Sequence, residues 1–426
     1  MEIFLYIVNH YLSQSVFIIG LVVVIGMIAM KRQWSQLLPS AIKAMIGFTM
    51  VNVGGQTLGM ALLPLATMIG KAFGNGSVPA TDIGTASAEY MTDLGTELSL
   101  IFAFGFLINL LLARFTKFKF VHLSAHVAFF FAGLIAALLK YNTPLDFWGI
   151  VAVGSVLLGC YMTFSCAYVN HCIKGVKGGE EITLAHSSST GLLISTYLAK
   201  AFGNKEHDLE EIKIPKQLAF LREMTIALTL VMTLLFLCVS IVADPAWVME
   251  NISGGQDVLV YSILQGISFG MWITVIITGV RMMLAEIIPA FHGIADKIIP
   301  GAKPGLDVPL LFPGYPTCVI VGFLCSLLSG LVGMVILAAV GYPIIVFPAL
   351  IPTFFTGAAT AIFGNAHGGA RGAVIGSLVN GFILIFGQAL LLPFVGSYEP
   401  IMRILSETDY CVYGPLLGFI LHALPF

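Results

Sequence analysis

The sequence predicts an all-α protein that crosses a membrane many times. Of its 426 residues, 58% are hydrophobic and only 10% are charged, against roughly 25% charged residues in soluble domains. Its mean hydropathy is +0.97, and its 20 Lys and Arg with 22 Asp and Glu are too few to cover a soluble surface of this size. Long apolar runs such as residues 17–30 favour helices, because a membrane barrel would show short segments of alternating hydrophobicity.

Apolar runs long enough to cross a bilayer of about 30 Å recur along the chain. Four further stretches are apolar overall but are interrupted by Gly, Pro and polar residues, as in discontinuous helices and re-entrant hairpins. We therefore expect about eleven spans plus two re-entrant hairpins. The regular runs lie at 15–30, 97–113, 121–139, 145–169, 224–243, 258–280, 317–341 and 372–393, and the interrupted stretches at 41–73, 179–202, 286–312 and 342–370.

The chain divides into two halves around its one clearly hydrophilic stretch. Residues 204–223 are rich in charge and contain Pro215, so they predict a cytoplasmic linker between a first membrane half, 1–203, and a second, 224–426. The Lys and Arg residues of the connections fall on one side if the N-terminus lies outside. We expect that orientation for the whole chain.

An internal repeat relates the two halves. An offset of 225 residues places Gly54 on Gly279 and Asp82 on Asp307 without a gap. Paired halves with interrupted segments in corresponding positions are typical of secondary transporters built from inverted repeats, which hold their substrate where the breaks meet.

Asp82 and Asp307 are the first candidate binding residues. Charge at membrane depth is costly, so such acids usually face a cavity and bind a ligand. A carboxylate accepts two hydroxyl protons at once, which suits a polyol or a sugar acid better than an anion. Both acids could instead cap the N-termini of re-entrant helices, and the two roles are compatible.

Three histidines are further candidates. His126 lies in the apolar run 121–139, whereas His186 and His367 each stand in a string AHxxxxG, among small polar residues that can surround a hydrophilic solute. The alternatives are a hydrogen-bonded packing role for His126 and turn chemistry at hairpin tips for the other two.

Gly54, Gly55 and Gln56 interrupt the apolar stretch 41–73. Two adjacent glycines let a helix unwind and turn backbone N–H groups toward a solute, and Gln56 offers both a donor and an acceptor. Close packing between helices is the alternative interpretation of the glycines.

Several classes of function are excluded. The net charge is −2 and no basic stripe is present, which excludes nucleic acid as a partner. The seven cysteines include no CxxC pair, so we expect neither a metal nor a cofactor. No Walker motif occurs, so energy for transport must come from an ion gradient or from another polypeptide. A membrane-embedded lipid enzyme is disfavoured because the histidines are scattered and form no HExxH motif.

Four long strings occur in order over nearly the whole chain. They are IKAMIGFTMVNVGG (42–55), LSAHVAFFFAGLIAALL (123–139), GVRMMLAEIIPAFHGIADKIIPGAKPGLD (279–307) and VFPALIPTFFTGAATAIFGNAHGGARGAV (346–374). Together they resemble the membrane component, enzyme IIC, of the ascorbate-type bacterial phosphotransferase system, within the ascorbate and galactitol superfamily.

The resemblance implies a homodimer in the bacterial inner membrane, surrounded by lipid, with a core domain and a V-shaped dimerisation domain that both draw on the two inverted repeats. The core would slide as an elevator and deliver the solute to a separate enzyme IIB, itself supplied by enzyme IIA, for phosphorylation. This chain would then carry no catalytic residue. The alternative is an ion-coupled secondary transporter of a small polar solute, in which Asp82 and Asp307 would be protonation sites.

The resemblance also implies a set of substrate contacts, and this chain departs from the family pattern within it. Ascorbate-specific members have glutamines where this chain has Phe130 and the serines at 187–189, so hydrogen bonding is lost and the shape of the pocket changes. We expect a different solute, such as galactitol, a pentose, a hexitol or another sugar acid. The implied contacts are Gly54, Gly55, Asp82, Ile83, Gly84, His126, His186, Ser187 and Asp307.

Overall fold

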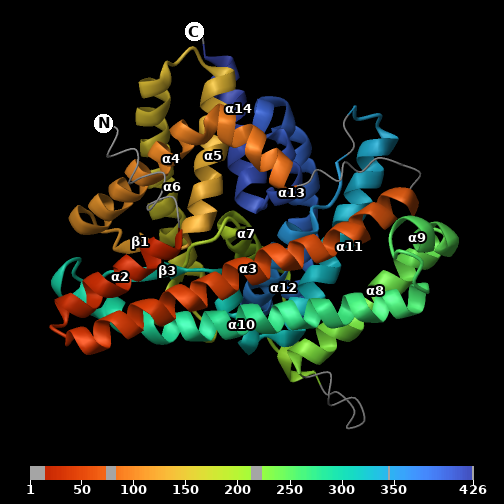
Figure 1. The fold of residues 1–426 in the computed structure, drawn as a ribbon, viewed down its shortest axis with the longest axis horizontal. Helices are drawn as coiled ribbons and strands as arrows, with labels where there is room; N and C mark the ends of the chain where they lie inside the picture. The colour runs from red at the N-terminus through yellow and green to blue at the C-terminus, as the bar shows by residue number, and fades with distance from the viewer. Residues whose placement is uncertain (1–14, 73–82, 213–222, 344–345, 425–426) are drawn as a thin grey trace.

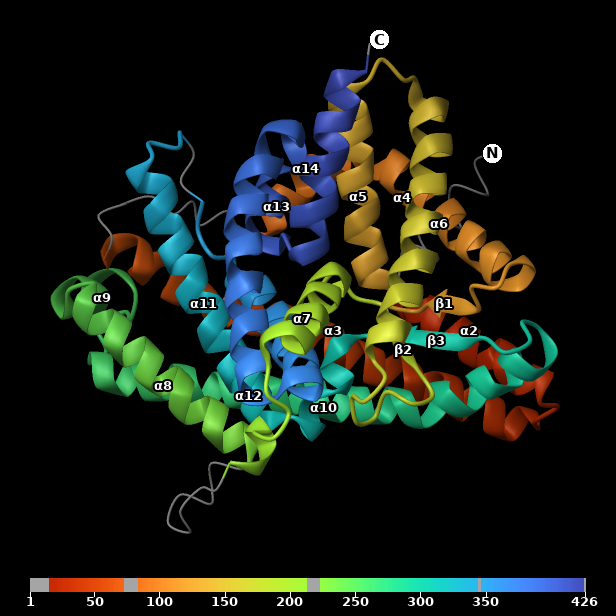
Figure 2. The ribbon, with the colours of Figure 1, turned by 180° about the vertical axis from the view of Figure 1, so that it is seen from behind.

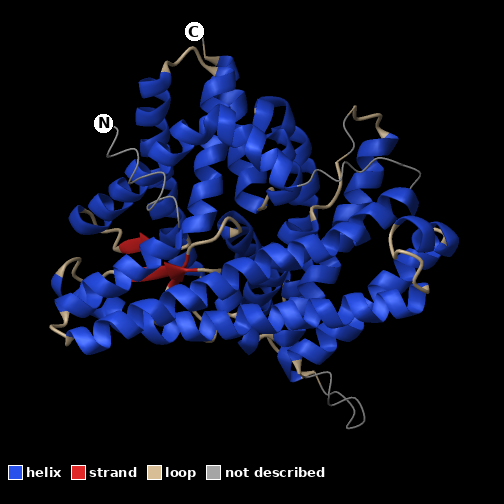
Figure 3. Cartoon of the chain, viewed as in Figure 1, coloured by secondary structure: helices blue, strands red, loops and turns tan. Residues whose placement is uncertain are grey.

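Apolar helices make up most of the chain (Figure 3). A computed structural model describes residues 15–72, 83–212, 223–343 and 346–424. Within these ranges, eight helices are long and apolar enough to cross a membrane. Every regular run predicted from the sequence overlaps a helix, although the run 121–139 begins in a short strand at residues 120–122. A multi-pass helical membrane protein is therefore confirmed, whereas eleven spans stay a prediction.

The helices are α2 (Ser15–Ala29), α3 (Trp34–Ala72), α4 (Ile83–Phe115), α5 (Ala125–Asn142), α6 (Phe147–Cys172), α7 (Ser189–Phe202), α8 (Met224–Val242), α9 (Pro245–Asn251), α10 (Val258–Lys297), α11 (Pro316–Ala339), α12 (Leu350–Leu391), α13 (Glu399–Leu405) and α14 (Thr408–Ala423). The strands are β1 (Phe120–His122), β2 (Thr183–Leu184) and β3 (Lys303–Leu306). The 3-10 helices are η2 (Leu209–Glu211), η4 (Val308–Leu310), η5 (Phe312–Gly314), η6 (Leu392–Phe394) and η7 (Gly396–Tyr398).

Helices α3 and α10 lie side by side along one face of the molecule (Figure 1). Glycines permit their close approach, because a Cβ on Gly47 would lie 2.7 Å from the carbonyl oxygen of Gly279. A Cβ on Gly54 would lie 2.8 Å from the side chain of Ile276. When the predicted offset of 225 is added to the first and last residue numbers of α3, the result agrees with the bounds of α10 to within one residue. The inverted relation of the two halves stays a prediction.

The interruption expected within residues 41–73 is wrong. Helix α3 is continuous from Trp34 to Ala72, although it contains Pro39, Pro64 and the glycine pair 54–55. The physical reason is that unwinding among apolar helices would leave backbone groups unpaired. For Gly54, close helix packing is therefore the interpretation that the structure supports.

Helix α12 is broken inside the stretch 342–370, where the sequence predicts an interruption. Gly369 has φ +62° and ψ −161°, a conformation that is essentially restricted to glycine. The carbonyl oxygen of Gly368 accepts the N–H of Asn204 at 2.8 Å, and Ala370 donates its N–H to the carbonyl oxygen of His207 at 2.6 Å. The described start of the predicted linker thus packs against this break, and residues 213–222 lie outside the described ranges.

A small parallel sheet, which the sequence analysis did not predict, joins three distant segments. β3 is its central strand, with β1 on one side and β2 on the other, and both pairings are parallel. Figure 2 shows this sheet between the layer of α2, α3 and α10 and the steeper helices α5 and α6. Strands of two to four residues are too short for an alternating pattern to be recognised in a sequence.

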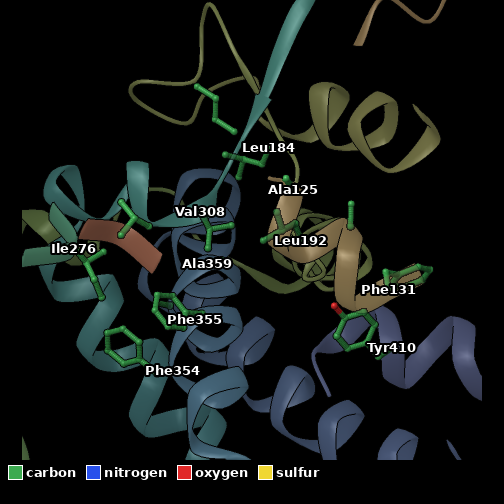
Figure 4. Close-up of a cluster of buried hydrophobic side chains, with 14 of the residues drawn as sticks. Ala125, Phe131, Leu184, Leu192, Ile276, Val308, Phe354, Phe355, Ala359 and Tyr410 are labelled. Atoms are coloured by element: carbon green, nitrogen blue, oxygen red, sulfur yellow. The ribbon is translucent and has the colours of Figure 1, made fainter. Parts of the chain in front are cut away.

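Buried aromatic side chains pack above the carboxyl edge of this sheet. Figure 4 shows Phe354 and Phe355 of α12 on one side of the cluster and Phe131 of α5 with Tyr410 of α14 on the other. The rings of Phe131 and Tyr410 have centroids 5.1 Å apart, and those of Phe354 and Phe355 are 5.2 Å apart. The contact between Phe131 and Tyr410 thus packs α5 against α14.

The contact between α3 and α10 generates a stability prediction. We expect Gly47→Ala to destabilise the protein by about 1–3 kcal/mol, because the new methyl group would overlap backbone atoms of α10. The matched control is Gly55→Ala on the same helix, where an added Cβ has no neighbour within 4 Å and helix propensity improves. Thermal unfolding of the detergent-solubilised protein measures both, and equal melting temperatures would contradict the described contact.

Candidate functional site

Polar side chains gather where the three strands of the parallel sheet end. β1 leads to His126 in the first turn of α5, β2 leads to His186 just before α7, and β3 is followed directly by Asp307. Because the carboxyl ends of parallel strands share one edge of a sheet, these residues meet. The Nε2 atom of His126 lies 3.3 Å from Oδ2 of Asp307, and that of His186 lies 3.6 Å from Oδ1.

Glu407, which the sequence analysis missed, completes this cluster from the N-cap of α14. Its Oε1 atom lies 3.5 Å from Nε2 of His186, and the hydroxyl of Ser187 donates a hydrogen bond to Oε2. His186 therefore lies between two carboxylates, those of Asp307 and Glu407. The available sequence signal was an acid directly before the apolar stretch 408–424.

The backbone fixes which nitrogen of His186 carries the proton. The N–H of Ser188 donates to Nδ1 of His186 at 3.2 Å, so Nδ1 is the acceptor of the ring. The proton then resides on Nε2, the atom that faces both carboxylates. The N–H at Nε2 of His186 is thereby a donor that Asp307 and Glu407 share.

The two carboxyl groups differ in their ionisation. Burial favours a higher pKa for Asp307, but the imidazoles of His186 and His126 outweigh it and hold the pKa below its ordinary value. Burial raises the pKa of Glu407 and prevails over the opposing effects of His186 and the Ser187 hydroxyl. Asp307 consequently retains its negative charge more readily than Glu407 does.

Helix capping accounts for other acidic contacts around the cluster. Asp307 accepts the N–H of Val308 at 2.7 Å, so its capping role and its place in the cluster coexist. The buried Asp409 accepts the backbone N–H groups of Ser189 and Thr190, at 3.2 and 2.6 Å. It thereby caps α7 from a different helix and fixes the segment that carries His186.

The cluster opens onto a cavity of about 540 Å³. Its polar wall comes from the strand ends and from Glu407, whereas the opposite wall comes from α3 and α10 through residues such as Phe48 and Ile276. The aromatic rings of Phe355 and Tyr410 complete the lining. A cavity of this size is typical of a site for one small molecule, and among the described residues no cluster could hold a metal ion.

Six of the residues selected from the sequence line this one cavity, and Phe130 and Ser187 are among them. The six are Gly55, His126, Phe130, His186, Ser187 and Asp307.

The other selected residues do not join the described lining. Gly54 packs against α10, and Nε2 of His367 lies 2.7 Å from the carbonyl oxygen of Cys172 beside the α12 break. Ile83 and Gly84 lie in the first turn of α4, but the structure does not describe their side chains or that of Gln56. Asp82 lies outside the described residues.

Comparisons with known proteins agree on the family. The family model described as "PTS system sugar-specific permease component" matches residues 10–407. The ascorbate-specific PTS system EIIC component of Mycoplasma pneumoniae is 24% identical over 460 aligned residues, which cover 96% of this chain and 70% of that relative. The chain therefore belongs to the EIIC family, the sugar-specific permease components of the phosphotransferase system.

Proposed function

We propose that this EIIC protein binds one small polyhydroxylated solute in the cavity and moves it across the bacterial inner membrane for phosphorylation by a separate enzyme IIB. The observation that carries the proposal is the partly buried row of His126, Asp307, His186 and Glu407 at the edge of a cavity of about 540 Å³. Carboxylate oxygens accept hydroxyl protons, and imidazole N–H groups donate to hydroxyl oxygens. A sugar, a polyol or a sugar acid would find both kinds of partner there.

The identity of the solute is open within this class. The Mycoplasma relative is named for ascorbate, but the resemblance implies glutamines in ascorbate-specific members where this chain has Phe130 and the serines at 187–189. Phe130 and Ser187 line the cavity, and the Ser187 hydroxyl donates a hydrogen bond to Glu407. These differences support a pocket adapted to another solute.

The division of the cavity between a polar and an apolar wall supports an elevator mechanism. The charged and imidazole groups come from the strand ends, from the first turn of α5 and from the N-cap of α14, and α5 packs against α14. The wall formed by α3 and α10 contributes mainly apolar side chains to the cavity. In the proposed movement, α5, α14 and the strand ends carry the solute along this wall. The protein would act as a homodimer, and each chain would contain two inverted repeats. We further propose that the N-terminus lies outside. Substrate contacts are also proposed for Asp82, Ile83, Gly84 and Gln56.

Transport in vesicles tests the coupling to phosphorylation. With enzymes IIA and IIB and the phosphoenolpyruvate-dependent system that phosphorylates enzyme IIA all present, we expect phosphorylated solute to accumulate, because phosphorylation removes the free solute and makes its uptake irreversible. Omission of enzyme IIB is the control and should stop accumulation. Unchanged uptake without a phosphoryl donor, driven instead by a proton or sodium gradient, would contradict the proposal and favour ion-coupled transport.

Substitutions in the cluster test the binding site. Asp307→Asn keeps an oxygen for the N–H of Val308 but removes the charge, and His186→Ala removes the shared donor. We expect each variant to weaken solute binding by about 10- to 100-fold, the loss expected for hydrogen bonds to a charged group. His292→Ala, at a side chain that is 59% exposed, is the control. Isothermal titration calorimetry measures the affinities, and wild-type affinity in both cluster variants would exclude this site.

A further inference from the structure

A second cavity, of about 400 Å³, lies between α2, α4 and α10 beside strand β1 (Figure 1). It shares no lining residue with the cavity of the candidate functional site. Its described lining is apolar except for Arg114, which stands in the last turn of α4. A polyhydroxylated solute would therefore find almost no hydrogen-bond partner there, whereas an apolar chain would be surrounded by apolar side chains.

The cavity runs from the interior of the protein to its apolar surface. Phe102 and Phe291 line its interior and are each only 1% exposed, whereas the lining side chains of Leu21, Leu111 and Phe115 are exposed. Exposed apolar surface of this kind on a chain that crosses a membrane marks contact with lipid. An acyl chain can thus enter the cavity from the bilayer without passing through water.

Arg114 gives the cavity one charged end. The centre of its guanidinium group lies 5.7 Å from the ring centroid of Phe115, which also lines the cavity. The ammonium group of Lys119 donates a hydrogen bond to the carbonyl oxygen of Arg114 at 3.0 Å, so a second positive charge lies nearby. Among the described residues, no acid forms an ion pair with either cation. A guanidinium group in this setting can bind a phosphate through two parallel N–H groups.

A second copy of the chain fits the cavity less well than a phospholipid does. A two-fold contact centred here would place the same surface on both subunits. It would bring a further Arg114 to this place, while the described lining contains no acid to pair with it. Charge complementarity therefore favours an occupant that has both an apolar chain and a negative headgroup.

We infer that this cavity binds one anionic phospholipid of the surrounding bilayer. Part of an acyl chain lies between α2, α4 and α10, and the phosphate lies on Arg114. Burial of the chain provides affinity, and the positive charge at the mouth provides the preference for a negative headgroup. This site is independent of the identity of the transported solute.

Native mass spectrometry of the purified full-length protein tests the lipid preference. Phosphatidylglycerol and phosphatidylethanolamine with the same acyl chains are added at equal concentrations. We expect each chain to retain one phosphatidylglycerol molecule with an affinity at least about fivefold higher than that for phosphatidylethanolamine. Equal affinities for the two lipids would overturn the inference.

Arg114→Gln tests the headgroup contact, because glutamine removes the charge and keeps a polar side chain. We expect the affinity for phosphatidylglycerol to fall by roughly fivefold, with little change for phosphatidylethanolamine. Arg371→Gln is the matched control, since Arg371 is exposed on α12, which contributes no residue to the described lining. An unchanged affinity in Arg114→Gln would overturn the role of Arg114.

Ala103→Phe tests whether the acyl chain occupies the cavity, because Ala103 lines it and a phenylalanine would fill space that the chain needs. We expect the affinity for both lipids to fall by about tenfold or more. Ala152→Phe, at an exposed position on α6 outside this lining, is the control, and thermal unfolding checks that both variants fold. Unchanged lipid binding in Ala103→Phe would overturn the inference. If that variant instead separated two copies of the chain and left lipid binding unchanged, the cavity would be a contact between subunits.

Discussion

The parallel pairing of β1, β3 and β2 is the constraint on which the rest of the structure depends. It joins segments from three distant parts of the chain. His126, His186 and Asp307 consequently lie at the same edge of the sheet. Helices alone would leave these residues on separate elements with no fixed register between them. These short strands thus place candidate binding residues at their carboxyl ends, as parallel strands do in soluble α/β proteins.

Charge pairing is the second constraint, and it follows from the first. Carboxylates in an apolar surrounding need donors, because an unpaired buried charge is very costly. Here each acid near the cavity has donors: Asp307 has two imidazoles and Val308, Glu407 has His186 and Ser187, and Asp409 has the first turn of α7. The same groups that stabilise the fold are therefore the groups that a hydroxylated solute would meet.

The sequence was sufficient for the membrane class, the regular helices and most of the polar wall. Hydropathy identifies α8 and α11 because lipid demands apolar side chains, and the cost of charge at membrane depth points to Asp307. The sheet was not predictable, since strands of two to four residues have no recognisable period. Glu407 was missed because it lies among other charged residues near α13 and only the fold brings it to His186. The predicted interruption at the glycines of α3 was wrong because glycine permits both unwinding and close helix packing.

The central claim is that a solute binds between the strand-end cluster and the wall of α3 and α10. The most direct measurement is a structure of the protein determined with its transported solute. We expect hydroxyl groups of the solute within hydrogen-bonding distance of the carboxylates of Asp307 and Glu407, with His186 between them. A solute bound elsewhere in the molecule, with this cavity empty, would contradict the central claim.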